Sequence, residues 1–80
     1  MALQDVCDTL IRSLKLQSAQ VKRFTETQAL LTNNWLQIHV DTNIGLICFL
    51  HPQEESKWYF YSNAAELHQI VSMAQRFLVR

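Results

Sequence analysis

The first part of the chain has the apolar spacing of an α-helix. Over residues 3–16, apolar side chains recur every three or four positions: Leu3, Val6, Cys7, Leu10, Ile11 and Leu14. This spacing places them along one face of a helix. Neither glycine nor proline marks the end of the helix, and the pattern itself extends to Val21. We place the end near Gln17, because residues 21–27 are rich in the β-branched and aromatic side chains that favour strands.

The apolar period changes to two after this helix, which is typical of strands that bury one face. A first strand is expected over residues 25–32. It is followed by Asn33 and Asn34, and asparagine tolerates the positive φ that a two-residue hairpin turn requires. With that turn the apolar faces of two strands agree with each other: Leu31 pairs with Leu36, Ala29 with Ile38, and Thr27 with Val40.

The register of the next hairpin has two solutions. Gly45, the only glycine, suits the left-handed position that closes a three-residue loop. In that register, which we favour, Ile47 and Phe49 point away from the core. Three other side chains of the strand then join the core face: Leu46, Cys48 and Leu50. A two-residue loop at residues 42–43 would instead bring Ile47 and Phe49 into the core, because side chains alternate along a strand.

A fourth strand and a second helix complete the chain. Residues 51–56 form a loop, since their proline cannot occupy a central strand position, and residues 57–61 form a short strand. Ser62 or Asn63 caps the final helix, and with Asn63 as the cap Glu66 completes a capping-box pattern. One apolar stripe then runs along the helix: Leu67, Ile70, Val71, Ala74, Phe77 and Leu78.

These elements predict an α+β fold in the order helix, four-stranded antiparallel meander, helix. Each helix has one apolar stripe and the sheet has an apolar face to receive both, so both helices are expected on one sheet face in a two-layer sandwich. The alternative is a three-layer domain in which one helix covers the second face. Residues 1–80 form a single domain in either case.

Composition places the chain among compact proteins that lie outside the membrane. Hydrophobic residues make up 49% of the chain, while glycine and proline occur once each, which is typical of an ordered domain. The first ten residues carry acids where a signal peptide would carry bases, and no apolar run has the roughly 18 residues of a membrane span. We therefore expect a soluble, cytoplasmic protein without a membrane partner.

The second face of the sheet is the candidate functional surface. In the favoured register it carries Ile47 and an aromatic set, with Trp58 and Phe60 expected to point outward in preference to Tyr59 and Tyr61. A large exposed apolar patch usually marks an interface. The side chains expected to form this interface are Trp35, Gln37, His39, Phe49, Trp58 and Phe60.

The pattern favours a small, non-enzymatic interaction or regulatory module. Its expected partner is a second copy of the chain or another cytosolic protein, because most soluble oligomers are two-fold homodimers. A sheet platform for single-stranded nucleic acid is the alternative. Nucleic acid is the less favoured partner because seven basic and seven acidic residues cancel, leaving no surplus of positive charge.

A small-ligand or catalytic domain that uses His39 and His51 is the third hypothesis. In the favoured register Cys48 points inward and His39 outward, so a cysteine–histidine nucleophile is not expected. Two histidines without a third ligand make a poor metal site, and the two cysteines lack the spacing of a zinc site or a disulfide framework. We expect no cofactor and no bound metal.

Overall fold

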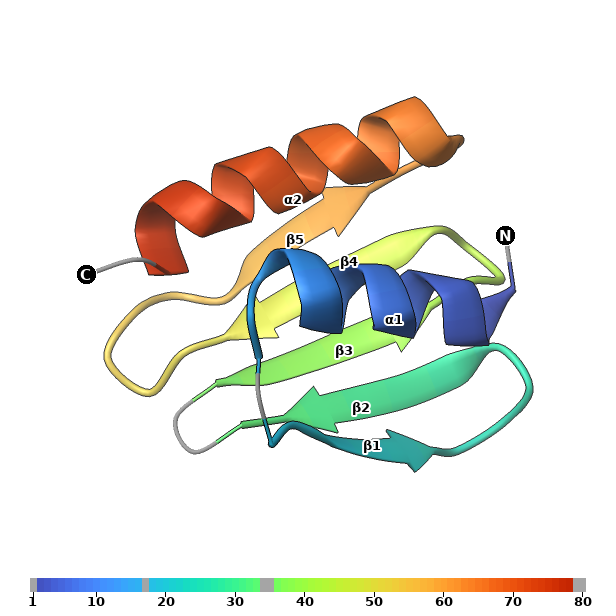
Figure 1. Ribbon diagram of the computed structural model, residues 1–80, viewed down its shortest axis with the longest axis horizontal. Coiled ribbons are helices and arrows are strands. Elements are labelled where there is room, and N and C mark those ends of the chain that lie inside the picture. The colour runs from blue at the N-terminus through green and yellow to red at the C-terminus, as the bar shows by residue number, and fades with distance from the viewer. Residues whose placement is uncertain (1, 17, 34–35, 79–80) are drawn as a thin grey trace.

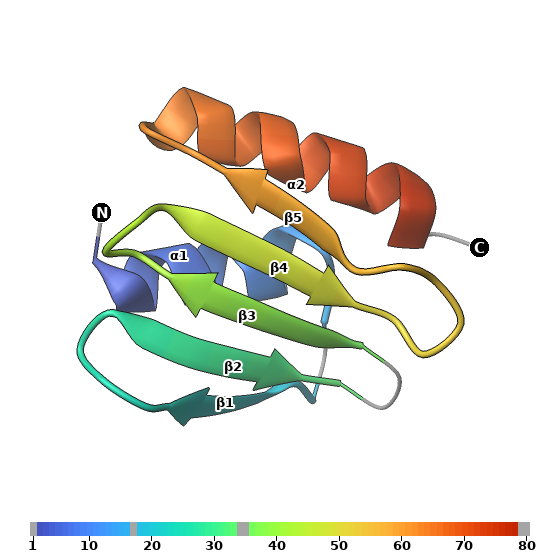
Figure 2. The same ribbon diagram turned by 180° about the vertical axis from the view of Figure 1, so that it is seen from behind.

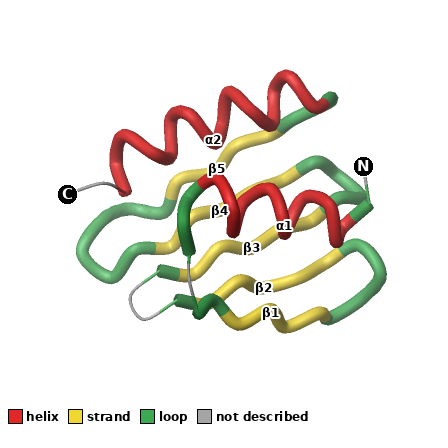
Figure 3. The backbone as a smooth tube through the Cα atoms, in the orientation of Figure 1, coloured by secondary structure: helices red, strands yellow, loops and turns green. Residues whose placement is uncertain are grey.

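The chain folds into two helices and one antiparallel sheet (Figures 1 and 3). The computed structural model describes residues 2–16, 18–33 and 36–78. Within them the elements are α1 (Leu3–Ser13), β1 (Gln20–Arg23), β2 (Gln28–Thr32), β3 (Gln37–Asp41), β4 (Leu46–Leu50), β5 (Lys57–Phe60) and α2 (Ala64–Leu78). The five strands are hydrogen-bonded in sequence order, β1-β2-β3-β4-β5. The α+β class is confirmed, but the sheet has five strands where four were predicted.

Both helices lie on the same face of the sheet. α1 contacts β2 and β3, while α2 lies along β5 (Figure 1). From behind, the strands stand in front of both helices (Figure 2). One core joins the apolar stripes of α1 and α2 to the inner side of the sheet, where the largest fully buried side chains include Leu10, Leu31, Ile38, Ile47, Phe49 and Leu67.

α1 ends at Ser13, four residues before the predicted end near Gln17. The chain leaves the helix at Lys15, whose φ of 53° is left-handed. The backbone N–H of Leu16 donates to the carbonyl of Ile11 at 2.9 Å, and Leu16 is buried. This hydrogen bond and the buried residue after the left-handed position define a Schellman ending, which usually has glycine where Lys15 stands. The sequence therefore lacks the ordinary stop signal.

The early end of α1 leaves room for the strand that was not predicted. β1 pairs antiparallel with β2, from Gln20 opposite Thr32 to Arg23 opposite Ala29. All four β1 residues are exposed, so the strand has no buried alternation to mark it in the sequence. The loop that joins β1 to β2 contains Thr27, which was expected on the core face of the first strand.

The β2–β3 hairpin has the predicted faces with a different register. Leu31 lies opposite Ile38 and Ala29 opposite Val40, a shift of two residues from the predicted pairs. The N–H of Asn33 donates to the carbonyl of Leu36 at 2.9 Å across the connection. Because a shift of two residues preserves side-chain alternation, Ala29, Leu31, Ile38 and Val40 still face the core.

The favoured register of the β3–β4 hairpin is wrong. Val40 lies opposite Ile47 and Ile38 opposite Phe49, so Ile47 and Phe49 are buried in the core. The other set, Leu46, Cys48 and Leu50, occupies the opposite face. The connection is a four-residue turn over 42–45, and one residue more than expected exchanges the faces of the whole strand.

Two contacts determine the length of this turn. The N–H of Asn43 donates to the Asp41 carboxylate at 2.9 Å, which holds the first half. Gly45 has a φ of 67°, and its carbonyl accepts from the N–H of Tyr61 at 2.9 Å. A Cβ atom at Gly45 would overlap the carbonyl oxygen of Tyr61, so glycine is required by close approach as well as by φ.

The start of α2 confirms the predicted cap. The N–H of Glu66 donates to Oδ1 of Asn63 at 2.9 Å. Oε1 of Glu66 accepts from the N–H of Ser62 at 2.7 Å, one residue before the usual capping-box position. These two bonds satisfy donors at the helix start and orient α2 as it leaves β5.

Candidate interaction surface

The side of the sheet turned away from α1 and α2 is called the outer face here. Strand alternation and pairing place on it Lys22 from β1, Gln28 and Leu30 from β2, Gln37, His39 and Asp41 from β3, Leu46, Cys48 and Leu50 from β4, and Trp58 and Phe60 from β5. Neither helix covers this face (Figure 2). Its cover, if it has one, must come from outside the described residues.

Exposed aromatic rings flank the outer face. Trp58 is 61% exposed and Phe60 is 64% exposed, whereas Tyr59 and Tyr61 pack against the core. The predicted outward orientation of Trp58 and Phe60 is thus confirmed. Phe24, just beyond β1, is 51% exposed at the opposite margin. Single aromatic residues on a surface are common, but three around one uncovered sheet face form a patch.

The other predicted interface residues have different outcomes. Gln37 and His39 lie exposed on the outer face, as predicted. Phe49 is wrong as an interface residue, because the β3–β4 register turns it inward until only 1% of it is exposed. There its ring meets Tyr59 edge-on, with ring centroids 5.9 Å apart. Trp35 lies outside the described residues.

A hollow of about 440 Å³ crosses the outer face. Phe24 and Trp58 line it from the two margins. The rest of the lining comes from β2, β3 and β4: Gln28, Ala29, His39, Val40, Asp41, Leu46, Cys48 and Leu50. Its size is within the range of ligand sites, and its open, largely apolar surface is equally suited to a protein side chain.

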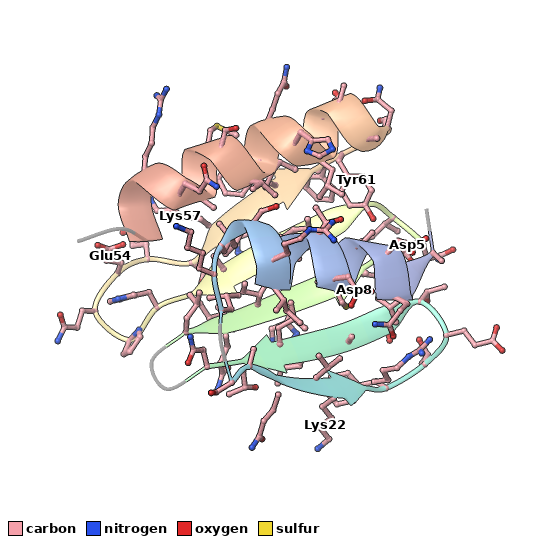
Figure 4. The ribbon with its side chains drawn as sticks, viewed as in Figure 1. Asp5, Asp8, Lys22, Glu54, Lys57 and Tyr61 are labelled. Atoms are coloured by element: carbon pink, nitrogen blue, oxygen red, sulfur yellow. The ribbon has the colours of Figure 1, made fainter. Side chains whose placement is uncertain are left out.

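The polar groups of the hollow are held in place by their neighbours. Nε2 of Gln28 donates to Oδ2 of Asp41 at 3.0 Å, while Oδ1 of Asp41 accepts from the Asn43 N–H. At the β1 margin, Nζ of Lys22 lies 5.6 Å from the ring centroid of Phe24, a cation–π distance. Lys22 extends away from the sheet at this margin (Figure 4).

Phe24 and the apolar β4 residues were missed in the sequence. Lys22 and Phe24 are two positions apart, so they lie on the same side of an extended chain. Had β1 been recognised as a strand, this spacing would have placed both residues on one face. Leu46, Cys48 and Leu50 were assigned to the core only because the turn was taken to be one residue shorter. On the outer face, Leu46, Cys48 and Leu50 therefore take the place of the predicted Ile47 and Phe49.

Cys48 and His39 lie directly opposite each other on the outer face, although they were predicted to face apart. Burial raises the pKa of the Cys48 thiol, whereas a nucleophilic cysteine needs a lowered pKa. Cys48 is only 3% exposed because it lies between His39 and Trp58 in the cross-strand row. The arrangement therefore does not activate a thiol nucleophile.

His51, the other candidate catalytic residue, belongs to the loop after β4. Its Nδ1 accepts from the backbone N–H of Gln53 at 3.1 Å, which uses one ring nitrogen in the turn. Within the described residues, no three His, Cys, Asp or Glu side chains form a group that could hold a metal ion. Among the described residues, His39 and His51 are therefore not part of a three-ligand metal group.

No protein-family model, curated protein sequence or solved structure matches the chain. In the part of the chain that the structure describes, neither helix has the length and apolarity needed to cross a bilayer. The outer face must therefore be interpreted from its own geometry.

Proposed function

We propose that the protein is a small, non-enzymatic interaction module that forms a homodimer by packing the outer faces of two copies together. The observation that carries the proposal is the exposed aromatic set Trp58, Phe60 and Phe24 around an apolar hollow that neither helix covers. An aromatic side chain can bury about 150–250 Å², so three that are more than half exposed present roughly 300–400 Å². Patches of this size on monomers are often functional.

Charge favours a second copy as the occupant. The described outer face carries one basic residue, Lys22, and one acidic residue, Asp41, and the chain has a formal net charge of zero. Two copies therefore meet without a large like-charge repulsion. A two-fold interface uses the same patch on both partners, so a nearly neutral apolar face is complementary to itself.

The dimer is expected to be weak and concentration-dependent. A stable interface buries about 800 Å² on each partner, which is more than the aromatic patch alone supplies. The remaining area would come from the polar rim, including the exposed Gln28 and Gln37. An interface with a small apolar centre and a polar rim predicts dissociation in the micromolar range.

The test is the solution mass of the full chain over a range of concentrations, by sedimentation equilibrium at neutral pH. We expect a monomer–dimer equilibrium, and Trp58→Ala should raise Kd by about tenfold or more because it removes a large exposed aromatic ring of the kind that often dominates binding energy. Met73→Ala is the matched control, since Met73 is an exposed apolar side chain on α2, away from the outer face. A wild-type chain that stays monomeric throughout the range would overturn the proposal, as would equal effects of the two substitutions.

A further inference from the structure

His39 occupies the centre of the outer face. It is the middle residue of β3, and β3 is the middle strand of the sheet. Leu30 and Cys48 lie beside it in the cross-strand row, with Lys22 and Trp58 at the two ends of that row. We propose that protonation of His39 controls the homodimer, which forms at neutral pH and dissociates on acidification. This inference rests on the proposed sheet-face dimer.

Two-fold symmetry brings the two histidines together. When two sheets pack face to face, the two-fold axis lies in the plane between them. A residue at the centre of the contact then faces its own copy whichever way the axis runs in that plane. Packed sheets are about 10 Å apart, and side chains from both sheets fill the gap. In a dimer whose contact is centred on the sheet, the two His39 rings therefore meet near the middle of the interface.

The surroundings of His39 offer little to balance a positive charge. Three charged or titratable groups share the outer face with His39: Lys22 from β1, Asp41 from its own strand and the Cys48 thiol from β4. The side chains that β2 and β5 contribute are uncharged, namely Leu30, Gln28 and Trp58. Lys22 has the wrong sign, and burial raises the pKa of Cys48, which keeps the thiol neutral.

Asp41 is the only acid among these groups, and each of its oxygens already accepts a hydrogen bond, one from Gln28 and one from Asn43. Neither of these two bonds involves the His39 ring. Two protonated rings facing each other would thus be desolvated and would repel each other. Both effects oppose association.

The sign of the pH dependence follows from linkage. An interface that disfavours charge on the facing rings must release protons on association, so acid favours the monomer and raises Kd. Histidine is the side chain whose charge ordinarily changes between pH 5 and 8. With two such sites in each dimer, Kd is expected to rise about 10- to 100-fold between about pH 7.5 and about pH 5.5.

The experiment measures Kd of the full chain at these two pH values by sedimentation for the wild type, His39→Asn and His68→Asn. His68 is exposed on α2 and serves as the matched control. We expect His68→Asn to follow the wild type and His39→Asn to have the same Kd at both pH values. His39→Gln provides a second neutral variant if the first fails to fold by circular dichroism.

Each outcome separates the two proposals. A monomer at neutral pH overturns both of them. A dimer whose Kd does not change with pH leaves the homodimer in place and overturns the role of His39. A pH dependence that persists in the neutral His39 variants also overturns that role. It would assign the proton to another residue, and His51 would be the first one to substitute.

Discussion

The two faces of the sheet are both apolar, yet they have opposite environments. On the inner face, Ile38, Ile47 and Phe49 are almost completely buried under α1 and α2. On the outer face, Trp58 and Phe60 come from a strand of the same sheet and remain mostly exposed. The outer face also carries polar side chains from β2 and β3, but residue type alone does not explain the difference, because each face has aromatic and aliphatic side chains. It comes from which face the two helices cover.

This contrast assigns different roles to similar side chains. A chain of 80 residues buries only about 60% of its unfolded surface, so its stability depends on a small core. The inner face supplies that core, and the apolar surface of the outer face adds to stability only when something covers it. Truncation of an inner side chain should therefore affect folding, and truncation of an outer one should affect association.

The largest expected effect is that of Phe49→Ala on folding. Phe49 is among the largest fully buried side chains, and its ring packs edge-on against Tyr59. Its truncation leaves a cavity in the core and should lower the free energy of unfolding by about 3–5 kcal/mol. The measurement is urea denaturation followed by circular dichroism in dilute solution, where self-association contributes little.

Trp58→Ala is the matched comparison for this measurement. It removes a larger ring from the opposite face of the neighbouring strand, and in dilute solution it should change the free energy of unfolding by less than about 1 kcal/mol. The reverse order of effects would mean that Phe49 and Trp58 have exchanged faces. That result would contradict the pairing of β4 with β3 and with β5.

Several features of the fold are predictable from the sequence because they depend on periodicity alone. The apolar stripe of α1 is correct, as is that of α2 as far as Ala74, and so are the buried faces of β2 and β3, whose alternation survives a register shift of two residues. The cap of α2 is also local information, since Asn63 and Glu66 lie within one helical turn. Such signals need no knowledge of distant contacts.

The errors occur where a single backbone position or a turn length decides the outcome. α1 ends with Lys15 in a left-handed conformation, and lysine is not a residue type that predicts this conformation. The β3–β4 turn has one residue more than expected because Asp41 and Tyr61 bind its two ends, and Tyr61 is distant in sequence. The first error was accompanied by a missed strand, β1, whose four exposed residues show no buried alternation, and the second error exchanged the faces of β4.

The same two errors account for the candidate surface. Gln37, His39, Trp58 and Phe60 were placed on the correct side, since their strands keep the predicted alternation. Phe49 was placed wrongly with the rest of β4. Phe24 and the apolar floor of the hollow were absent from the prediction for the same reasons, although they make the outer face a better candidate for association.

The two cysteines sharpen the comparison because each lies on a different side of the sheet. Cys7 lies on α1 and is buried in the core, whereas Cys48 belongs to the outer face and is covered by its cross-strand neighbours. Trp58→Ala should therefore expose Cys48 and leave Cys7 protected. We expect labelling of Cys48 by a thiol reagent to accelerate about tenfold or more, because access to the thiolate controls the rate.

The labelling is measured in dilute native protein, with each site identified by peptide mass. Met73→Ala again serves as the control and should leave both rates unchanged. Equal acceleration at Cys7 and Cys48 would indicate general unfolding, and no acceleration at Cys48 would show that Trp58 does not cover it.

The smallest expected effect concerns the helix that covers the inner face. Lys15 holds a left-handed φ of 53° at the position after α1 where glycine is usual. A residue with a side chain loses about 1–2 kcal/mol of stability in this conformation. Glycine avoids this strain, but its greater freedom in the unfolded chain offsets part of the gain. Lys15→Gly should therefore raise the free energy of unfolding by about 0.5–1 kcal/mol relative to Lys15→Ala. The alanine variant also lacks the lysine charge near the helix end, so the comparison between the two isolates the backbone effect.

Because α1 lies on the inner face, the dimer Kd should be the same for both variants. Equal stability of the two variants would mean that residue 15 does not need the left-handed conformation and that α1 ends in another way.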